Sequence, residues 1–254
     1  SRKQRGIEQS LLTIHGLDYR FEDESRFSGL IDKTKPFADY VSDQRLFVRT
    51  NAYEEYRKYG IKADVGHGFV LASALFLFEM NFRSGVISAD YNLAQEYNTH
   101  PWGTNSLTNP LFSSGGFRME TANLNVTRAE KMRLIYDSME ALSSLTFCVD
   151  YQARPNNCGR CSKCIRTKAM FLSSVGVVPD IFLDKTFDVG MLSIISPSKR
   201  SEKAFLLDLY LSASKNSYLS RIPGLETRAL QVFSEPTGLR KRIRRWAQSI
   251  ADSV

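Results

Sequence analysis

Four short apolar runs interrupt a chain that otherwise follows helical periodicity. They are rich in Leu, Ile, Val and Phe, are closed by glycine or polar residues, and cover residues 11–15, 45–50, 85–89 and 145–150. Short continuous runs of this kind are typical of strands that are buried on both faces of a parallel sheet. We therefore predict strands at these four positions.

Helical patterns occupy most of the remaining sequence. Residues 67–80 form a strongly apolar pattern, and Thr127 with Glu130 makes a capping box ahead of a helix that we expect to run to about residue 142. The polar stretch between the first two strands can hold a short helix, and residues 97–118 are a loop by composition. Further helices are predicted over residues 53–59, 161–175, 203–214 and 239–250. This alternation favours an open α/β sheet followed by a helical C-terminal part.

The composition is that of an ordinary globular protein. Of the 254 residues, 43% are hydrophobic and 24% are charged, and the mean hydropathy is −0.28. These values exclude a disordered chain, a collagen and a coiled coil. The longest apolar run, residues 68–80, contains Glu79 and is shorter than the roughly 20 residues that a membrane-spanning helix needs. We expect a core helix there.

The net charge of +7 is concentrated at the two ends of the chain. Residues 1–5 contribute +3, residues 237–254 contribute +4, and the residues between them sum to zero. A basic footprint over the whole body, as in many nucleic-acid-binding domains, is therefore absent. The C-terminal pattern suits a helix that docks on the protein's own body or on a partner subunit, or one that binds RNA, DNA or an anionic membrane. Its apolar stripe consists of Leu239, Ile243, Trp246 and Ile250.

All four cysteines lie within one short window, with the spacing Cys148-x9-Cys158-x2-Cys161-x2-Cys164. Four thiolates at this spacing can form a tetrahedron around Zn²⁺. Residues 151–168 contain no acid, and five basic residues can offset a dianionic zinc–thiolate centre; these are Arg154, Arg160, Lys163, Arg166 and Lys168. An iron–sulfur cluster is the main alternative, and four unpaired thiols are another. A single tight cluster also favours a reducing compartment, so we expect structural zinc in a cytoplasmic protein.

The cysteine run and its neighbours resemble the zinc-binding segment of the 7-cyano-7-deazaguanine synthases, which belong to the PP-loop ATP pyrophosphatase superfamily. The resemblance extends from about Leu11 to Phe182. It is carried by Cys148 with residues 157–167 (NCGRCSKCIRT), and by shorter motifs that read IHGLD at residues 14–18, TN at 50–51, PWG at 101–103, NPL at 109–111 and RAEK at 128–131.

This resemblance implies an α/β fold with a doubly wound, mostly parallel, Rossmann-like sheet of the adenine-nucleotide alpha-hydrolase (HUP) type. It implies one domain over residues 1–182, with the zinc segment at residues 148–167, and a helical C-terminal region over residues 183–254. The implied reaction begins when a substrate carboxylate attacks the α-phosphate of ATP, which releases pyrophosphate. A nitrogen or sulfur nucleophile then displaces AMP. The expected ligands are ATP with Mg²⁺ and an unidentified acid.

The superfamily's phosphate-binding loop, Ser-Gly-Gly-x-Asp-Ser, does not occur in the sequence. Backbone N–H groups of this loop hold pyrophosphate at a helix N-terminus. Residues 114–117 (SGGF) repeat part of the motif without its Asp-Ser ending, and we interpret them as loop glycine. Residues 1–10 match the end of the helix that follows the loop in the family, with Gly6 as its cap. We therefore expect the loop in a segment upstream of Ser1.

Several candidate ligand-binding residues follow the predicted strands, where open α/β sheets place ligand groups. His15 and Asp18 follow the first strand, and Asn51 follows the second. Ser88 and Asp90 end the third strand and can contact ATP. The structural alternatives are a core or second-layer histidine for His15 and a turn residue for Asn51.

Other candidates lie in the long loop and in the helix after it. Trp102, Gly103 and Thr104 can shape a substrate or pyrophosphate loop, since glycine permits close backbone approach and tryptophan offers a stacking face. Arg128 and Lys131 occupy the first turns of a helix, where cations suit a bound phosphate. The alternatives are an aromatic side chain that pins the loop and a solvated basic face.

Two functions follow from these expectations. The first is an ATP-dependent, AMP- and pyrophosphate-forming ligase or amidating enzyme that acts on an unidentified carboxylate, in which zinc is structural because protein fills all four of its positions. The second is a degenerate, non-catalytic, zinc-containing relative that acts as a binding or assembly subunit, for example in a nucleic-acid or antiviral complex. A protein partner or a homo-oligomer fits either function, and nucleic acid would bind through the basic C-terminal helix.

Overall fold

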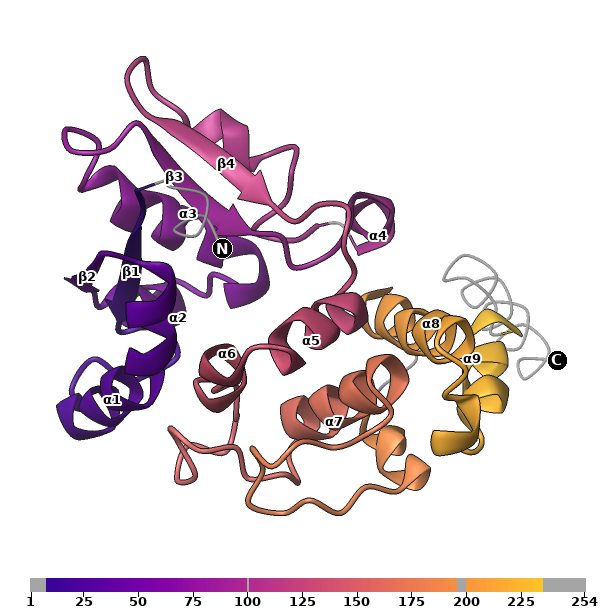
Figure 1. Cartoon of the computed structure of the whole chain (residues 1–254). Coiled ribbons are helices and arrows are strands. Elements are labelled where there is room, and N and C mark those ends of the chain that lie inside the picture. The colour runs from indigo at the N-terminus through magenta and orange to yellow at the C-terminus, as the bar shows by residue number, and fades with distance from the viewer. Residues whose placement is uncertain (1–7, 100, 196–199, 235–254) are drawn as a thin grey trace, which may run out of the picture.

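The computed structural model describes residues 8–99, 101–195 and 200–234 (Figure 1). Its N-terminal half contains two separate pairs of parallel strands. β1 (Ser10–His15) pairs with β2 (Gln44–Arg49). The second pair is formed by β3 (Ser84–Ser88) and β4 (Arg118–Ala122). The structure therefore confirms a mixed α/β fold with short parallel strands, while the doubly wound order of the sheet stays a prediction.

Helices provide the crossovers that parallel pairing requires. The long helix α1 (Glu24–Val41) connects β1 to β2, and α2 (Ala52–Lys58) and α3 (Ala63–Phe76) connect β2 to β3. Between β3 and β4 the chain forms α4 (Leu93–Thr99) and the 3₁₀ helix η2 (Asn109–Phe112). The carboxyl ends of the strands thereby precede the helices, as in other α/β units.

The prediction of a strand over residues 145–150 is wrong, because side chains bond the backbone there. The amide of Asn157 accepts from the N–H of Phe147 at 3.2 Å and donates to the carbonyl of Leu145 at 2.9 Å. Arg154 Nε donates to the carbonyl of Cys148 at 2.6 Å. These groups replace the partners that a strand ladder would supply.

The helices around residues 63–76 and 128–143 have other bounds than their sequence patterns suggest. The capping box at Thr127 is present and begins α5 (Arg128–Tyr136), but a second helix, α6 (Met139–Ser143), follows after a break. Ser138 causes the break, since its hydroxyl accepts from the N–H of Ala141 at 3.3 Å and caps the new helix. Helix α3 begins four residues before its predicted start at residue 67 and ends at Phe76.

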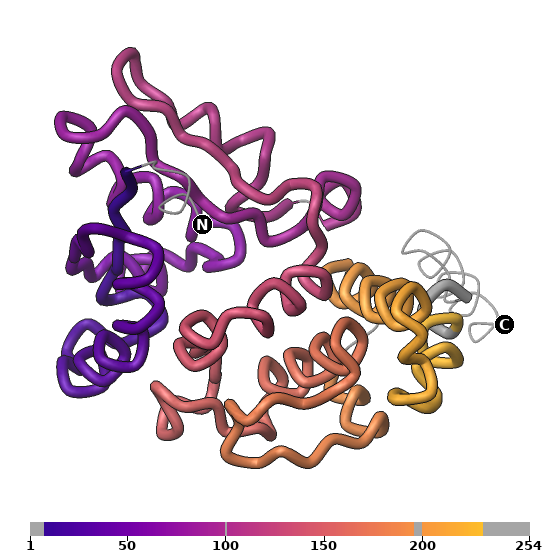
Figure 2. Tube along the Cα trace, in the orientation of Figure 1, coloured from indigo at the N-terminus to yellow at the C-terminus, as the bar shows by residue number. Residues whose placement is uncertain are grey.

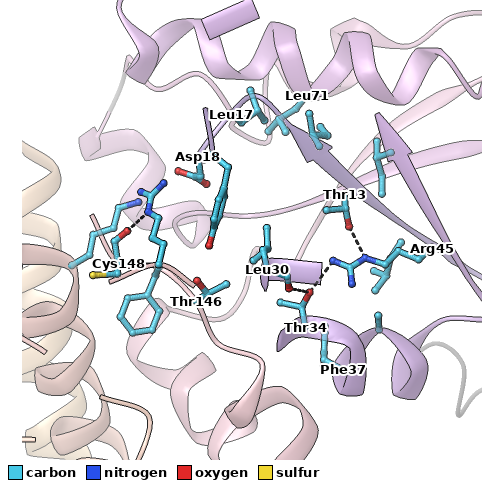
Figure 3. Close-up of a pocket in the computed structure, with 18 residues that line it drawn as sticks. Thr13, Leu17, Asp18, Leu30, Thr34, Phe37, Arg45, Leu71, Thr146 and Cys148 are labelled. Carbon is cyan, nitrogen blue, oxygen red and sulfur yellow. Dashed lines mark hydrogen bonds between the residues drawn. The ribbon is translucent and has the colours of Figure 1, made fainter. Parts of the chain in front are cut away.

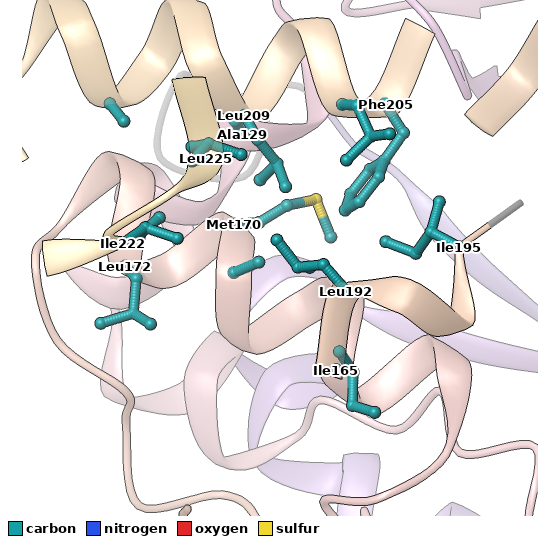
Figure 4. Close-up of a cluster of buried hydrophobic side chains, with 13 residues drawn as sticks. Ala129, Ile165, Met170, Leu172, Leu192, Ile195, Phe205, Leu209, Ile222 and Leu225 are labelled. Atoms are coloured by element: carbon teal, nitrogen blue, oxygen red, sulfur yellow. The ribbon is translucent and has the colours of Figure 1, made fainter. Parts of the chain in front are cut away.

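The main hydrophobic core lies among the C-terminal helices. Ala129 of α5 packs against α7 (Ser162–Ser174), α8 (Arg200–Lys215) and α9 (Leu225–Ser234), as Figure 4 shows. The 3₁₀ helices η3 (Val189–Ile194) and η4 (Leu219–Arg221) close this core. Its fully buried members include Ala169, Leu206, Leu209 and Leu225. Because these residues lie on both sides of residue 182, the proposed division at that point stays a prediction.

Helices α5 and α6 join the two halves of the molecule. In Figure 2 they lie between the strand pairs and the C-terminal helices, and α6 packs on α1 while α5 packs on α7. Among the described helices, none is both long and apolar enough to cross a bilayer. The helix predicted over residues 239–250 lies outside the described residues.

Candidate metal centre and adjoining cavity

The four cysteines converge on one point. All four Sγ atoms lie within 4.8 Å of one another, and the pairs Cys148–Cys161 and Cys158–Cys164 are 3.7 and 3.9 Å apart. A disulfide would need about 2.05 Å, whereas a tetrahedral ion with Zn–S bonds of about 2.3 Å separates its sulfurs by about 3.8 Å. Four ligands that share one ion fit these distances better than cysteines on separate irons of a cluster. The cysteines therefore lie close enough to hold a single metal ion such as zinc.

The turn after Cys158 brings two backbone N–H groups within hydrogen-bond distance of the Cys158 sulfur. The backbone N–H groups of Arg160 and Cys161 donate to Cys158 Sγ at 3.4 and 3.3 Å. This turn requires Gly159, whose φ is +85° and whose absent Cβ would lie 2.0 Å from the carbonyl oxygen of Asp184. The turn thereby supplies two hydrogen bonds to a sulfur that lies within the four-cysteine cluster.

A fully buried amide holds the segments that carry the cysteines. Asn157 is 0% exposed, and besides its bonds to residues 145 and 147 it donates to the carbonyl of Ile181 at 3.2 Å. Its own carbonyl accepts from the N–H of Leu183 at 2.9 Å. Asn157 thereby connects the segment before Cys148 to the loop that follows α7.

Most basic residues around the cysteines already have partners. Lys168 is fully buried, and its ammonium donates to the carbonyls of Gly159 at 2.8 Å and Thr186 at 2.7 Å. Burial lowers the pKa of Lys168. Arg160 pairs with Asp184 at 2.7 Å. These residues tie the cysteine turn to the following loop as well as adding positive charge near the thiols.

The thiols differ in acidity. Burial raises the pKa of Cys148 to about 11 and also raises that of Cys164. At Cys161 burial acts in the same direction, but the N–H groups of Cys164 and Val149 outweigh it and lower the pKa to about 6. A bound metal must displace the protons of the less acidic thiols, so its affinity falls as the pH falls.

A cavity of about 840 Å³ adjoins this centre at the carboxyl ends of β1 and β3. The first turns of α3, α5, α7 and α8 all contribute to its wall. Helix N-termini carry partial positive charge. The same lining holds five carboxylates and three lysine or arginine side chains, so the wall offers groups for both cations and anions. The polar residues from these first turns are Asp64, Arg128, Ser162, Lys163, Ser201 and Glu202.

Asp90 is the centre of a polar network in the cavity wall. Its carboxylate accepts from the indole N–H of Trp102 at 2.8 Å, the hydroxyl of Thr104 at 3.2 Å and the guanidinium of Arg128 at 2.5 Å. Burial opposes ionisation of Asp90, but the charge of Arg128 and the bond from Trp102 outweigh it and hold its pKa below the usual value. The network joins the end of β3 to the long loop and to α5.

His67 extends this network by one further step. Its Nδ1 lies 3.0 Å from the carbonyl oxygen of Ala63, which only accepts, so Nδ1 carries a proton. Its Nε2 lies 3.0 Å from the hydroxyl of Thr104. Thr104 therefore lies between the imidazole of His67 and the carboxylate of Asp90 and can bond to either group.

Two acids of α8 complete the wall. Glu202 forms an ion pair with Arg166 of α7. Asp208 accepts from the N–H of Ala129 at 3.1 Å, at the N-terminus of α5, and burial raises its pKa. The charge of Arg166, like that of Arg128, is thus already balanced by a carboxylate.

The structure brings some of the predicted site residues together. Asp18, Trp102 and Arg128 line the large cavity. Thr104 is buried beside it in the Asp90 network. The N–H of Gly103 donates to the carbonyl of Asp64 at 2.8 Å, which fixes the loop against α3.

The other predicted residues line neither cavity described here. His15 is buried, with its ring stacked on Phe27 at 4.1 Å. Asn51 and Ser88 are exposed at the start of α2 and the end of β3. Lys131 donates to the carbonyl of Ala89 at 2.6 Å. A ligand role for these four residues stays a prediction.

A second, mostly apolar cavity of about 390 Å³ lies beside β1 and α1 (Figure 3). In it Arg45 donates to the hydroxyls of Thr13 and Thr34, each at 2.8 Å. The two cavities adjoin, because they share Leu17, Asp18, Leu71, Phe147 and Lys163.

Sequence reasoning missed several residues of the cavity. Asp64 was missed because the apolar pattern placed the start of α3 at residue 67, and His67 was missed because it belongs to no motif in the sequence. Glu202 and Asp208 carry no local signal, since only the packing of α8 on α5 and α7 brings them to the wall.

Comparisons of the chain with protein-family models, with curated proteins and with solved structures give no match.

Proposed function

We propose that this chain forms the nucleotide-binding part of an ATP-dependent, AMP- and pyrophosphate-forming ligase or amidating enzyme similar to the 7-cyano-7-deazaguanine synthases. Its substrate would be a carboxylic acid, and its four cysteines would hold a structural Zn²⁺. The observation that carries the proposal is the large cavity at the carboxyl ends of β1 and β3, beside the four-cysteine centre. Ligands of parallel α/β folds bind at such strand ends.

The chemistry of the cavity supports a nucleotide ligand. Its wall combines the first turns of four helices with three lysine or arginine side chains, which suit phosphate groups, and with five carboxylates, which suit the Mg²⁺ that accompanies ATP. Tyr53, Tyr91 and Trp102 also line the cavity and offer aromatic faces for a base or an aromatic acid. Tyr91 and Trp102 lie beside Arg128, because the Arg128 guanidinium stacks over the Tyr91 ring and shares the Asp90 carboxylate with Trp102.

The phosphate-binding loop would come from outside residues 1–254. Within the described residues, neither β1 nor β3 has a strand on its second edge. Leu11, Leu12 and Ile14 of β1 are only half buried, although their side chains are apolar. A further parallel strand, followed by a glycine-rich loop and a helix, would cover these edges and bring backbone N–H groups to the cavity.

Product analysis tests the proposed reaction. The protein encoded by the complete reading frame is incubated with ATP, Mg²⁺, ammonium and a panel of carboxylic acids. We expect AMP and pyrophosphate in equal amounts, dependent on one acid. Arg128→Gln should reduce turnover, while Arg118→Gln, an exposed residue at the start of β4, should not. ADP as the product, or no consumption of ATP with any acid, would overturn the proposal.

The alternative is a non-catalytic binding or assembly subunit. The absence of Ser-Gly-Gly-x-Asp-Ser from residues 1–254 favours it. The same experiment separates the two functions, because a degenerate subunit would bind ATP or a partner without forming AMP.

A further inference from the structure

We propose that two copies of this chain form a two-fold symmetric dimer, in which the outward face of α3 packs against the same face of the second copy. The inference does not depend on the proposed reaction, because this face belongs to neither cavity. It concerns an apolar surface that the candidate site does not use.

Helix α3 is apolar on more than one side. Its sequence predicts a core helix, and Val70, Ala72 and Ala74 are indeed buried. Phe69 and Leu77, however, are 58% and 68% exposed. A helix that is apolar all round is normally buried on every side. No segment among the described residues supplies the cover that this pattern predicts for Phe69 and Leu77.

The exposed residues of α3 form one stripe. Val65, Phe69, Ser73 and Leu77 follow each other at intervals of four residues, which places them on one face of the helix. At 100° per residue, the residues of α3 that line the large cavity lie on the opposite face; they are Ala63, Asp64, His67 and Leu71. The polar side of α3 therefore faces the cavity, and the outward stripe carries no charge. An ordinary surface helix has the reverse arrangement.

The apolar surface continues beyond α3. Phe69 contacts Phe112 with ring centroids 5.2 Å apart, which places η2 beside the stripe. Leu111 of η2 is 80% exposed, and Met80, which follows α3, is 92% exposed. Together with the stripe these two residues expose about 700 Å², more than the roughly 300–600 Å² of the largest apolar patch on a typical monomer. This area is close to the roughly 800 Å² per chain that a standard interface buries.

The order of large and small side chains makes the stripe self-complementary. Phe69 and Leu77 lie four residues on either side of Ser73. A two-fold axis at Ser73 in an antiparallel, crossed pair of α3 helices therefore packs Phe69 of each chain against Leu77 of the other. The small side chain of Ser73 permits close approach at the axis. Its hydroxyl donates to the carbonyl of Phe69 at 2.8 Å, so this polar group keeps a partner when the stripe is buried.

Sedimentation equilibrium of the zinc-loaded protein measures the association. We expect a reversible dimer with twice the 28.8 kDa mass of the chain. Phe69→Glu and Leu77→Glu should each raise the Kd of the dimer at least about 100-fold, because the symmetry buries each new charge twice without a partner. Leu134→Glu is the matched control, since Leu134 is 66% exposed on α5, outside the stripe, and should leave the Kd unchanged.

Cross-linking tests the position of the axis, and it remains decisive if a glutamate variant fails to fold. Ser73→Cys changes one atom and places one thiol of each chain near the axis. A short bis-maleimide should join these thiols into a covalent dimer. Leu134→Cys should give no such product. The wild-type protein, with zinc on its four cysteines, shows how much cross-linking arises from the native thiols.

Three results would overturn the inference. These are a chain that stays monomeric up to its highest soluble concentration, a dimer whose Kd changes no more in Phe69→Glu and Leu77→Glu than in Leu134→Glu, and a dimer that Ser73→Cys does not cross-link. A dimer that forms no AMP from any acid would retain this inference and overturn the ligase. AMP formation by a monomeric protein would do the opposite.

Discussion

Arg128, in the first turn of α5, donates to the carboxylate of Asp90 across 2.5 Å. The contact neutralises a cation at a helix N-terminus and anchors α5 to the end of β3. Arg128 was expected from the sequence to meet phosphate, and the structure shows that any such phosphate must compete with Asp90. The pair therefore has a structural role whether or not a ligand is bound.

The Asp90 network predicts how the free energy of unfolding changes at acidic pH. Because the folded pKa of Asp90 lies below its unfolded value, its stabilisation is complete above about pH 4 and is lost as the pH falls toward the folded pKa. Asp90→Asn should lower the free energy of unfolding at pH 7 by about 1 kcal/mol, since the pair is partly exposed to solvent.

Urea denaturation between pH 7 and pH 3 measures both effects. The difference between wild type and Asp90→Asn should shrink as the pH falls. Asp150→Asn, an exposed acid near the cysteines, serves as the control. A constant difference over this range would contradict the assigned ionisation of Asp90.

Metal content distinguishes a single zinc ion from an iron–sulfur cluster. We expect about one zinc per chain and no visible absorbance, because the sulfur distances suit one tetrahedral ion. Cys158→Ser should lose the metal and unfold at a much lower temperature, whereas Ser162→Ala in the same segment should keep both metal and stability. A Cys158→Ser protein with wild-type thermal stability would show that the metal does not support the fold.

Asn157 predicts a large stability loss from a single side chain. Asn157→Ala leaves the backbone groups of Leu145, Phe147 and Ile181 without their partners, which should cost about 2–4 kcal/mol. Asn156→Ala, which removes only a bond to the ammonium of Lys33, should cost less than about 0.5 kcal/mol. Chemical denaturation of the zinc-loaded proteins measures the two values, and similar losses would refute the assigned role.

The positive φ and close packing at Gly159 predict that the turn between Cys158 and Cys161 requires glycine at this position. Gly159→Ala places a Cβ 2.0 Å from the carbonyl oxygen of Asp184 at a φ of +85°, so the turn must open and zinc affinity should fall by at least about tenfold. Gly116→Ala is the matched control, since its Cβ would meet nothing within 4 Å. Competition with a zinc-binding dye measures the zinc affinities of the two variants. Equal affinity in the two variants would show that the turn tolerates a side chain.

Local patterns predicted the parts of the fold that local interactions determine. Three strands and the helix after Cys161 appear within about two residues of their predicted positions, because runs of apolar side chains and a capping position are visible in the sequence. The spacing of the four cysteines alone likewise predicts that they form one cluster. β4 was missed, since RMETA has few apolar residues and follows directly on a glycine-rich loop.

The remaining features depend on contacts between distant residues. Residues 145–150 look like a strand, but Asn157 and Arg154 take its backbone bonds. The cavity wall combines Asp90 and Trp102 with Glu202, which is about 100 residues later in the chain. No window of sequence contains such a combination.

β1 and β3 each have one edge that pairs with no described strand, and these edges affect the association state of the protein. Backbone N–H and C=O groups on a strand edge that pairs with no other strand among the described residues can bond to the same edge of another molecule, and the half-buried apolar side chains of β1 would strengthen that pairing. The protein should therefore self-associate as its concentration rises. Expression together with a strand that covers these edges should keep the protein monodisperse.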